Sequence, residues 1–169
     1  MAFIVVNGST LAFADYQDVL DTDQRLVEAN EGLTEDVVEA ATIRSTQRIL
    51  SLLRATDWWR DFNSALTPGL LFDSISNLPA LDPTRIVARQ ADFTELTVYY
   101  ALWRYILPKV ADFSKEEHNE RAKIGFYQDK YNLLFEEIIK SGDWYDFNGD
   151  GLISIPEYQP GHPNLARIR

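Results

Sequence analysis

The sequence contains no cysteine, which excludes disulfide bonds, cysteine nucleophiles and cysteine-ligated zinc sites. It has only two histidines, His118 and His162, and neither lies in the Glu-x-x-His spacing of di-iron helical bundles. His118 lies among charged residues, as expected for a solvated helix face. The G-x-S-x-G, P-loop and G-x-G-x-x-G motifs are also missing. We therefore expect a protein that is not an enzyme.

Long apolar runs are lacking as well. None reaches the roughly 18 residues that a membrane helix requires, and the first residues, MAFIVVNGSTLAFAD, lack the basic start of a signal peptide. We expect no membrane association. The chain has 169 residues, of which 46% are hydrophobic, and this suits one folded domain with a substantial core.

Positive charge is scarce, and the net charge of −10 is unevenly distributed. Residues 15–39 contain nine acids and one base, and residues 143–157 contain four acids and no base. The simplest interpretation of the first segment is a solvated helix face. Because affinity for phosphates comes from Lys and Arg, direct binding of nucleic acid is disfavoured.

The dipeptide Asn7-Gly8 predicts a β-hairpin over residues 3–13. It lies between the two β-prone runs FIVV and STLAF, and Asn-Gly is the strongest short hairpin signal. An isolated two-stranded hairpin is only marginally stable in water. We therefore expect this hairpin to lean on the body of the protein or on a neighbouring subunit.

The rest of the chain predicts a mainly α fold, a helical bundle of about four helices with an N-terminal β-hairpin and an extended C-terminal tail. The expected helices cover the acidic segment up to Gly32, residues 34–55, residues 92–107 and residues 114–140. Thr34 is the expected N-cap of the second helix, and Ser114 with Glu117 forms a capping box for the fourth. Pro108 should end or kink the third helix.

The segment between the second and third helices, residues 60–82, has no regular period but carries enough apolar residues to predict a packed, irregular connection. Before it stand the adjacent residues Trp58 and Trp59. Two neighbouring side chains cannot both point into one face of a helix. Either one of them is a surface anchor, or both pack under the following segment.

The most specific motif is DFNGDGLISIPE, residues 146–157. Its spacing, D-x-[DN]-x-[DN]-G-x5-E, resembles the calcium loop of EF-hand proteins. Calcium requires six to eight oxygen ligands, and the glycine permits the sharp turn that presents them inward. The ligands that the resemblance implies are Asp146, Asn148, Asp150, the Leu152 carbonyl, Ser154 and a bidentate Glu157.

The surroundings of this loop argue against a calcium sensor. Sensor EF-hands work through paired loops with helices on both sides. Here there is one loop, and Pro156 and Pro160 prevent a normal exiting helix. We interpret the loop as a static site, holding a structural Ca²⁺ ion, that fixes the tail to the last helix. The alternative is an Asx-rich turn without a metal.

From Thr34 onward, the order of elements resembles the head–tail connector (adaptor) proteins of tailed bacteriophages. The resemblance lies in a long amphipathic helix, an irregular segment, a helix pair and an extended tail. It is carried by the segments LTEDVVEAATIRSTQRILSLLRATDWW, ELTVYYALWRYILPKVADF, the 114–140 helix and YQPGHPNLARIR. We therefore divide the chain into a hairpin arm (1–14), a helical bundle (15–142) and a calcium-type loop with a docking tail (143–169).

The resemblance implies a structural virion protein in the phage neck, assembled in the host cytoplasm. Such adaptors form a homo-oligomeric ring, commonly a dodecamer, under the portal protein. The ring lengthens the DNA channel, lets DNA pass without sequence-specific contact, and offers a platform to tail or neck proteins. The implied interface candidates are Trp58, Trp59, Arg167 and Arg169. The alternative function is a monomeric, EF-hand-like calcium-binding protein with a regulatory or interaction role.

Overall fold

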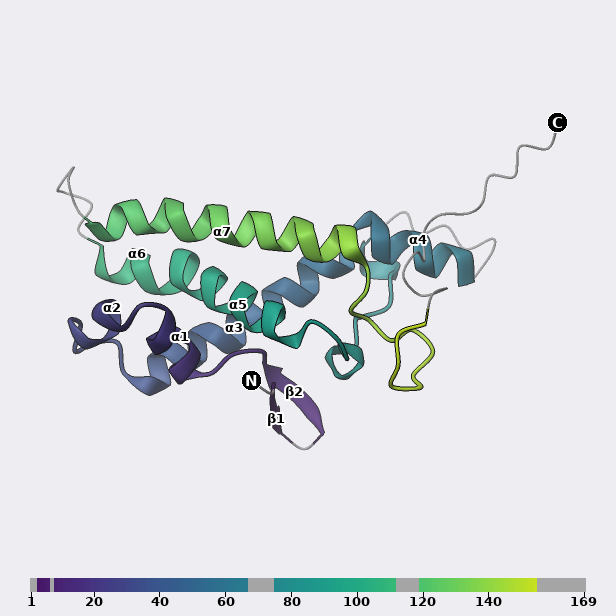
Figure 1. Ribbon diagram of the computed structural model, residues 1–169, viewed down its shortest axis with the longest axis horizontal. Helices are drawn as coiled ribbons and strands as arrows, with labels where there is room; N and C mark the ends of the chain where they lie inside the picture. Colours follow the sequence, from purple (N-terminus) through teal and green to yellow (C-terminus); the bar gives the residue numbers. More distant parts are fainter. Residues whose placement is uncertain (1–2, 7, 67–74, 112–118, 155–169) are drawn as a thin grey trace.

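The computed structural model describes residues 3–6, 8–66, 75–111 and 119–154. As predicted, these residues are mainly helical and start with a small antiparallel hairpin (Figure 1). Strand β1 (Ile4–Val6) pairs with β2 (Ser9–Ala12), and a bulge interrupts the register between Ile4 and Val5. Gly8 supplies the positive φ of +78° that the tight turn requires.

The acidic segment forms two short helices, α1 (Tyr16–Thr22) and α2 (Gln24–Glu28), where the sequence suggested continuous helical spacing. Asp15 begins α1 with a capping box in which Asp18 takes part. Asp23 ends α1 and also caps α2, because its carboxylate accepts a bond from Leu26 N. An aspartate offers the backbone an alternative partner to the next helical carbonyl, which explains the break at this position.

The predicted second helix is α3 (Glu35–Arg54), which begins after Thr34 and ends before Ala55. Its buried stripe includes Val38, Ala41, Ile49 and Leu53, as the periodicity predicted. The tryptophan pair does not prolong it. Asp57–Leu66 form a separate helix, α4, where the sequence suggested only the end of α3 and an irregular connection. Two 3-10 turns follow, η1 (Ile75–Asn77) and η2 (Pro83–Arg85).

The third predicted helix is central, and its second half is distorted. Helix α5 (Gln90–Ala101) runs into a π-helical turn, η3 (Leu102–Ile106), and then into α6 (Leu107–Val110). Pro108 lies at the start of α6, lacks a backbone N–H and collides with a regular preceding turn. The wider η3 turn accommodates it, and the helix ends three residues after Leu107. The predicted effect of Pro108 is therefore confirmed.

Helix α7 (Asn119–Ser141) lies alongside α5 and α6 (Figure 1). It ends at Gly142, which has a φ of +62°. The predicted capping box of Ser114 and Glu117 lies outside the described residues. Helix α5 is covered by α3 and α7, so most of its side chains are buried. None of the described helices is both long and apolar enough to cross a bilayer.

The core has two adjoining parts. One surrounds Phe93 and Trp144, where the base of the hairpin and the C-terminal loop meet the bundle. The other surrounds Leu102 and Leu107, where α1 and α2 pack on the distorted helix. The hairpin does lean on the body, as predicted: Phe13 N donates to Thr46 Oγ1 (3.0 Å), and Thr94 Oγ1 donates to Phe13 O (2.8 Å).

Candidate functional site: the C-terminal loop and its aromatic pocket

The start of the calcium-type loop is fixed to the bundle by backbone pairing. Ile86 and Tyr145 form an isolated antiparallel bridge. Asp146 N donates to Arg85 O (2.9 Å), and Val87 N donates to Trp144 O (3.2 Å). The indole of Trp144 is fully buried. The loop therefore leaves the protein from a rigid base.

Asp146 is the organising side chain of the loop. It is only 2% exposed, and its two carboxylate oxygens accept bonds from Gly149 N (2.6 Å) and Gly151 N (2.7 Å). Burial by itself raises the pKa of Asp146. The backbone N–H groups of Gly151, Gly149 and Asp150 and the charge of Arg85 outweigh it, so the pKa of Asp146 is lowered overall.

The next two predicted ligands continue the same turn. Asn148 Oδ1 accepts from Asp150 N (2.8 Å), and Asp150 Oδ1 accepts from Leu152 N (2.8 Å). Gly149 and Gly151 have φ values of +80° and +81°, a conformation that other residues adopt only at a cost. The side chain of Leu152 is exposed, as is Ser154.

The described part of the loop does not complete a calcium shell. Among the residues that the structure describes, no group of three or more His, Cys, Asp or Glu side chains is placed to hold a metal ion. Asp146 and Asp150 supply two carboxylates, and Asn148 Nδ2 donates to Asp150 Oδ2 (3.1 Å). The expected bidentate ligand, Glu157, lies outside the described residues. The loop geometry is that of a preformed Asx-rich turn with side-chain oxygens on the alternate residues Asp146, Asn148 and Asp150.

Trp58 and Trp59 pack together beneath this loop. The ring of Trp58 lies 4.6 Å from that of Trp144 and 5.2 Å from that of Phe147, measured between centroids. Trp59 is 4% exposed, and its indole N–H donates to Pro79 O (2.9 Å). Of the two interpretations of this pair, the structure supports joint packing. Trp59 is not a surface anchor in this subunit.

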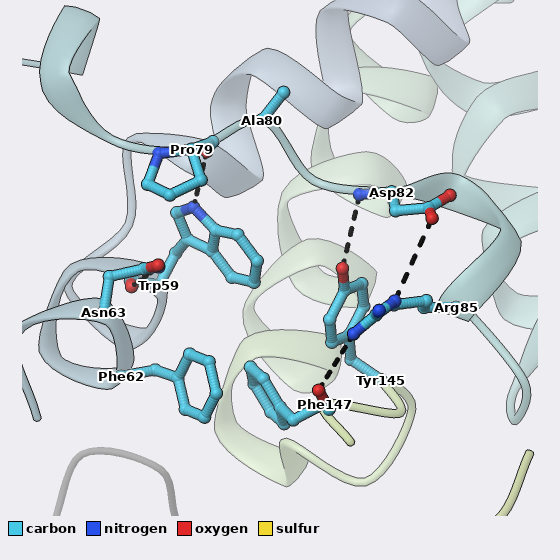
Figure 2. A pocket seen from close by; sticks show the side chains of 9 residues that line it. All are labelled: Trp59, Phe62, Asn63, Pro79, Ala80, Asp82, Arg85, Tyr145 and Phe147. Atoms are coloured by element: carbon cyan, nitrogen blue, oxygen red, sulfur yellow. Dashed lines mark hydrogen bonds and ion pairs between the residues drawn. The ribbon is translucent and has the colours of Figure 1, made fainter. Parts of the chain in front are cut away.

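Beside these tryptophans is an open cavity of about 320 Å³ (Figure 2). Helix α4, the segment after η1 and the C-terminal loop all contribute to its wall. Its lining residues are Trp59, Phe62, Asn63, Pro79, Ala80, Asp82, Arg85, Tyr145 and Phe147. We call this cavity the aromatic pocket.

Two polar side chains brace the aromatic pocket. Arg85 Nη1 donates to Phe147 O (2.9 Å), which ties the loop to η2. The hydroxyl oxygen of Tyr145 accepts from Asp82 N (3.2 Å). Burial raises the pKa of Tyr145, so this phenol is neutral at ordinary pH and can donate its proton to a ligand.

Arg89 joins the elements around the site. Its guanidinium contacts Asp92 Oδ2 (2.5 Å) on α5, Glu137 Oε1 (2.5 Å) and Ser141 Oγ (2.7 Å) on α7, and Asp143 Oδ1 (3.7 Å) after α7. It has a φ of +54°, the only positive φ among the non-glycine residues that the structure describes. A left-handed arginine is costly, so the ionic contacts must outweigh the strain.

Apolar surface lies elsewhere on the molecule. Among the described residues, the exposed large hydrophobic side chains are Val5 (56%), Leu11 (40%), Phe126 (55%), Leu133 (70%) and Leu152 (71%). We use the name hairpin patch for the two exposed apolar residues of the hairpin, Val5 on β1 and Leu11 on β2, although the register pairs Val5 with Thr10. Phe126 and Leu133 lie seven residues apart on one face of α7 and are named the α7 patch.

Sequence reasoning found the loop but missed the aromatic pocket and the two arginines. The aromatic run Trp144, Tyr145 and Phe147 directly before and within the loop was a visible signal for the pocket. Asp82 and Asp92 are near partners of Arg85 and Arg89, but the contacts that join these arginines to the loop and to α7 are made with residues distant in the chain. The predicted interface residues Arg167 and Arg169 lie outside the described residues.

A scan of family models, a search of curated proteins and a search of solved structures each returned no match to the chain. The site is therefore interpreted from its own chemistry.

Proposed function

We propose that this chain is a head-to-tail connector (adaptor) subunit of a tailed bacteriophage, forming a homo-oligomeric ring under the portal. The observation that carries the proposal is the presence of two separate apolar patches on one subunit. The hairpin patch and the α7 patch lie on different elements, and Figure 1 draws these elements at opposite edges of the molecule. Together with the resemblance described above, this arrangement favours an assembly protein.

A ring requires two different, complementary surfaces on every subunit. In a heterologous interface, one patch of a subunit meets the other patch of its neighbour, and the series closes when the rotation fits. A two-fold dimer would need only one patch. The hairpin patch of one subunit against the α7 patch of the next would cover both apolar surfaces. It would also give the small hairpin a partner beyond its own body.

Charge supports a role next to passing DNA. The exposed acids at the end formed by α1, α2 and the start of α3 are Asp21, Glu28, Glu31, Glu35 and Asp36. Where these side chains flank a channel, they repel the phosphates and let DNA slide without sequence-specific contact. In this proposal the tail, with Arg167 and Arg169, docks on the portal protein, and the opposite face receives tail or neck proteins.

The test is the mass of the assembly for two matched variants of α7. Leu133→Glu places a charge in the α7 patch, and Asn132→Glu places the same charge on the adjacent exposed residue. Native mass spectrometry should show a ring, with a mass that is a multiple of 19.4 kDa, for wild type and Asn132→Glu. Leu133→Glu should remain monomeric. Each protein is measured by itself and again in the presence of the portal protein of the same phage.

Two results would contradict this proposal. A wild-type chain that stays monomeric in both settings would exclude a ring former. A Leu133→Glu chain that assembles like wild type would exclude the α7 patch as the contact.

The second candidate function is a calcium-binding protein with a structural Ca²⁺ ion in the loop. It is favoured by the preformed turn around Asp146 and the alternating oxygens of Asn148 and Asp150. Calorimetry should then show heat on adding calcium to wild type and none with Glu157→Gln. The absence of heat for both proteins would leave the loop as an Asx-rich turn.

A further inference from the structure

The aromatic pocket has the shape and chemistry of a peptide site. Its volume of about 320 Å³ lies near the lower end of the ~300–1,000 Å³ that ligand pockets span, which suits a few residues of extended chain. In Figure 2 the rings of Trp59, Phe62, Tyr145 and Phe147 surround a common space. Phe62 and Phe147 lie 3.7 Å apart between centroids and form one wall.

Two polar side chains at this pocket, Tyr145 and Arg85, can donate hydrogen bonds to a ligand, and Asp82 and Asn63 line it as well. The Tyr145 oxygen already accepts from Asp82 N, so its proton is left for donation. Arg85 uses Nη1 for Phe147 O and has further N–H groups on its guanidinium. Proline has a carbonyl acceptor and no N–H, and proline-rich segments are recognised in aromatic-lined grooves that donate to their carbonyls.

The chain itself contains such a segment. Residues 155–169 read IPEYQPGHPNLARIR, with Pro156, Pro160 and Pro163 within eight residues. These residues lie outside the described structure. Residues 156–163 contain one acid, Glu157, and no lysine or arginine, and Arg167 and Arg169 follow them in the chain.

The segment is also long enough to reach the pocket. Phe147 is part of the pocket wall, and the described chain ends at Ser154, seven residues later. Those residues span at most ~25 Å, and the turns at Gly149 and Gly151 shorten this distance. Residues 155–163 can span ~30 Å when extended. Tethering also gives a millimolar effective concentration, so a weak intrinsic affinity is sufficient.

We propose that the aromatic pocket holds the chain's own proline-rich segment, residues 156–163. The contact is intramolecular, with proline rings against Trp59, Phe62 and Tyr145. It directs residues 164–169, including both arginines, away from the body. This inference does not depend on the proposed oligomeric ring, because the pocket and the segment belong to the same chain.

The absence of cysteine makes a direct test simple. In the full-length chain, Ala80→Cys places a thiol at the exposed pocket wall, and Gln159→Cys places one beside Pro160. At low protein concentration, mild oxidation should form an intramolecular disulfide, seen as a faster band on a non-reducing gel. The matched control pairs Gln159→Cys with Gln128→Cys, which lies on the exposed face of α7. This control pair should form its disulfide at least ~10-fold more slowly, because residue 159 is not held near residue 128.

A second variant tests the role of proline without touching the folded body. Replacing Pro156, Pro160 and Pro163 by alanine should slow disulfide formation by the Ala80/Gln159 pair several-fold. Three outcomes would overturn the proposal. These are equal rates for the pocket and control pairs, an unchanged rate after the proline replacements, or exclusively intermolecular disulfides, which would seat the segment on a second copy.

Discussion

At the residue scale, Arg89 and Asp146 show how single side chains hold the C-terminal region in place. Arg89 connects α5, α7 and the segment that leads to the loop, and it does so from a left-handed backbone conformation. Asp146 gathers the backbone N–H groups of the loop from a buried position. Both side chains connect groups that would otherwise separate. Replacing either side chain should therefore change the free energy of unfolding measurably.

Arg89 predicts an unusual order of stability among its variants. Arg89→Ala loses the ionic contacts and keeps the left-handed strain. It should lower the free energy of unfolding by about 1–2 kcal/mol, a modest value because the partner carboxylates are partly exposed and solvent weakens their attraction. Arg89→Gly loses the same contacts but removes the strain, and it should be more stable than Arg89→Ala by ~1 kcal/mol. Urea unfolding measures both. If Arg89→Ala were more stable than Arg89→Gly, the backbone strain proposed at residue 89 would be contradicted.

Asp146 predicts a loss of stability in acid. Its pKa is lower in the folded protein than the unfolded value of about 3.9, so the unfolded state binds more protons in this range. The stabilisation is complete above the unfolded pKa and is lost as the pH falls through the folded pKa. The stability difference between wild type and Asp146→Asn should therefore be largest above about pH 5 and shrink towards pH 3. Urea unfolding at several pH values would show it, and a constant difference would contradict it.

At the element scale, the corner between α1 and α2 depends on one carboxylate. Asp23 caps α2, accepts two contacts from Lys123 Nζ (2.8 and 2.7 Å) and accepts the hydroxyl of Tyr127 (3.1 Å). Burial raises the pKa of Tyr127, and the charge of Asp23 adds to the effect. Through this contact the two short acidic helices are attached to α7. The acidic segment is thus partly structural and not only a solvated face.

Asp23→Ala should separate α1 and α2 from α7. Loss of the cap and of the partner for Lys123 should cost about 2–3 kcal/mol, allowing for the partial exposure of Lys123. Asp21→Ala, an exposed acid on the same helix, is the control and should change stability by less than ~0.5 kcal/mol. Thermal or urea unfolding measures both. Equal effects of the two variants would show that the corner is not held by Asp23.

Most elements could be predicted because their signals are local. The signals at Asn7-Gly8, at the helix start after Thr34, at Pro108 and at Gly142 each act on the residues beside them, although the Thr34 side chain makes no capping hydrogen bond. The sequence did not predict that α4, which contains Trp58, and α2, which follows Asp23, are separate helices. The start of α4 depends on tertiary packing. The start of α2 depends on the Asp23 carboxylate, which has a partner a hundred residues away. The aromatic pocket was missed for the same reason. Its walls come from three segments that the sequence does not place together.

At the scale of the whole molecule, the exposed acids are spread over several elements. Five lie around α1, α2 and the start of α3, and others lie on α4, at the N-cap of η2, and on α5, α7 and the loop. The exposed large apolar side chains lie on the hairpin, α7 and the loop. The proposed ring would bury the hairpin patch and the α7 patch against copies of the chain, and the acids at the α1–α3 end lead to a prediction about DNA.

The proposed ring should not retain DNA, and reversing the charge of the acidic end should change this. Glu31→Lys, Glu35→Lys and Asp36→Lys together add six units of positive charge per chain, enough to neutralise phosphates. Gel-shift assays should show no retention for wild type and retention that weakens with salt for the triple variant. The control is a variant with lysines at four exposed positions of α7, Gln128, Asp129, Asn132 and Glu136, which also adds six units. Equal retention by both variants would show that the acidic end does not face the DNA.

The bridge between Ile86 and Tyr145 sets an order of folding events. It joins residues 59 positions apart, so its formation closes a stretch of chain that contains the paired helices α5 and α7. Contacts of such separation form late because the entropy of closing the intervening chain must be met first. During synthesis the C-terminal loop can therefore dock only after residues 86–145 have left the ribosome. Subunits cut short before residue 145 would keep their helices but lack a finished site.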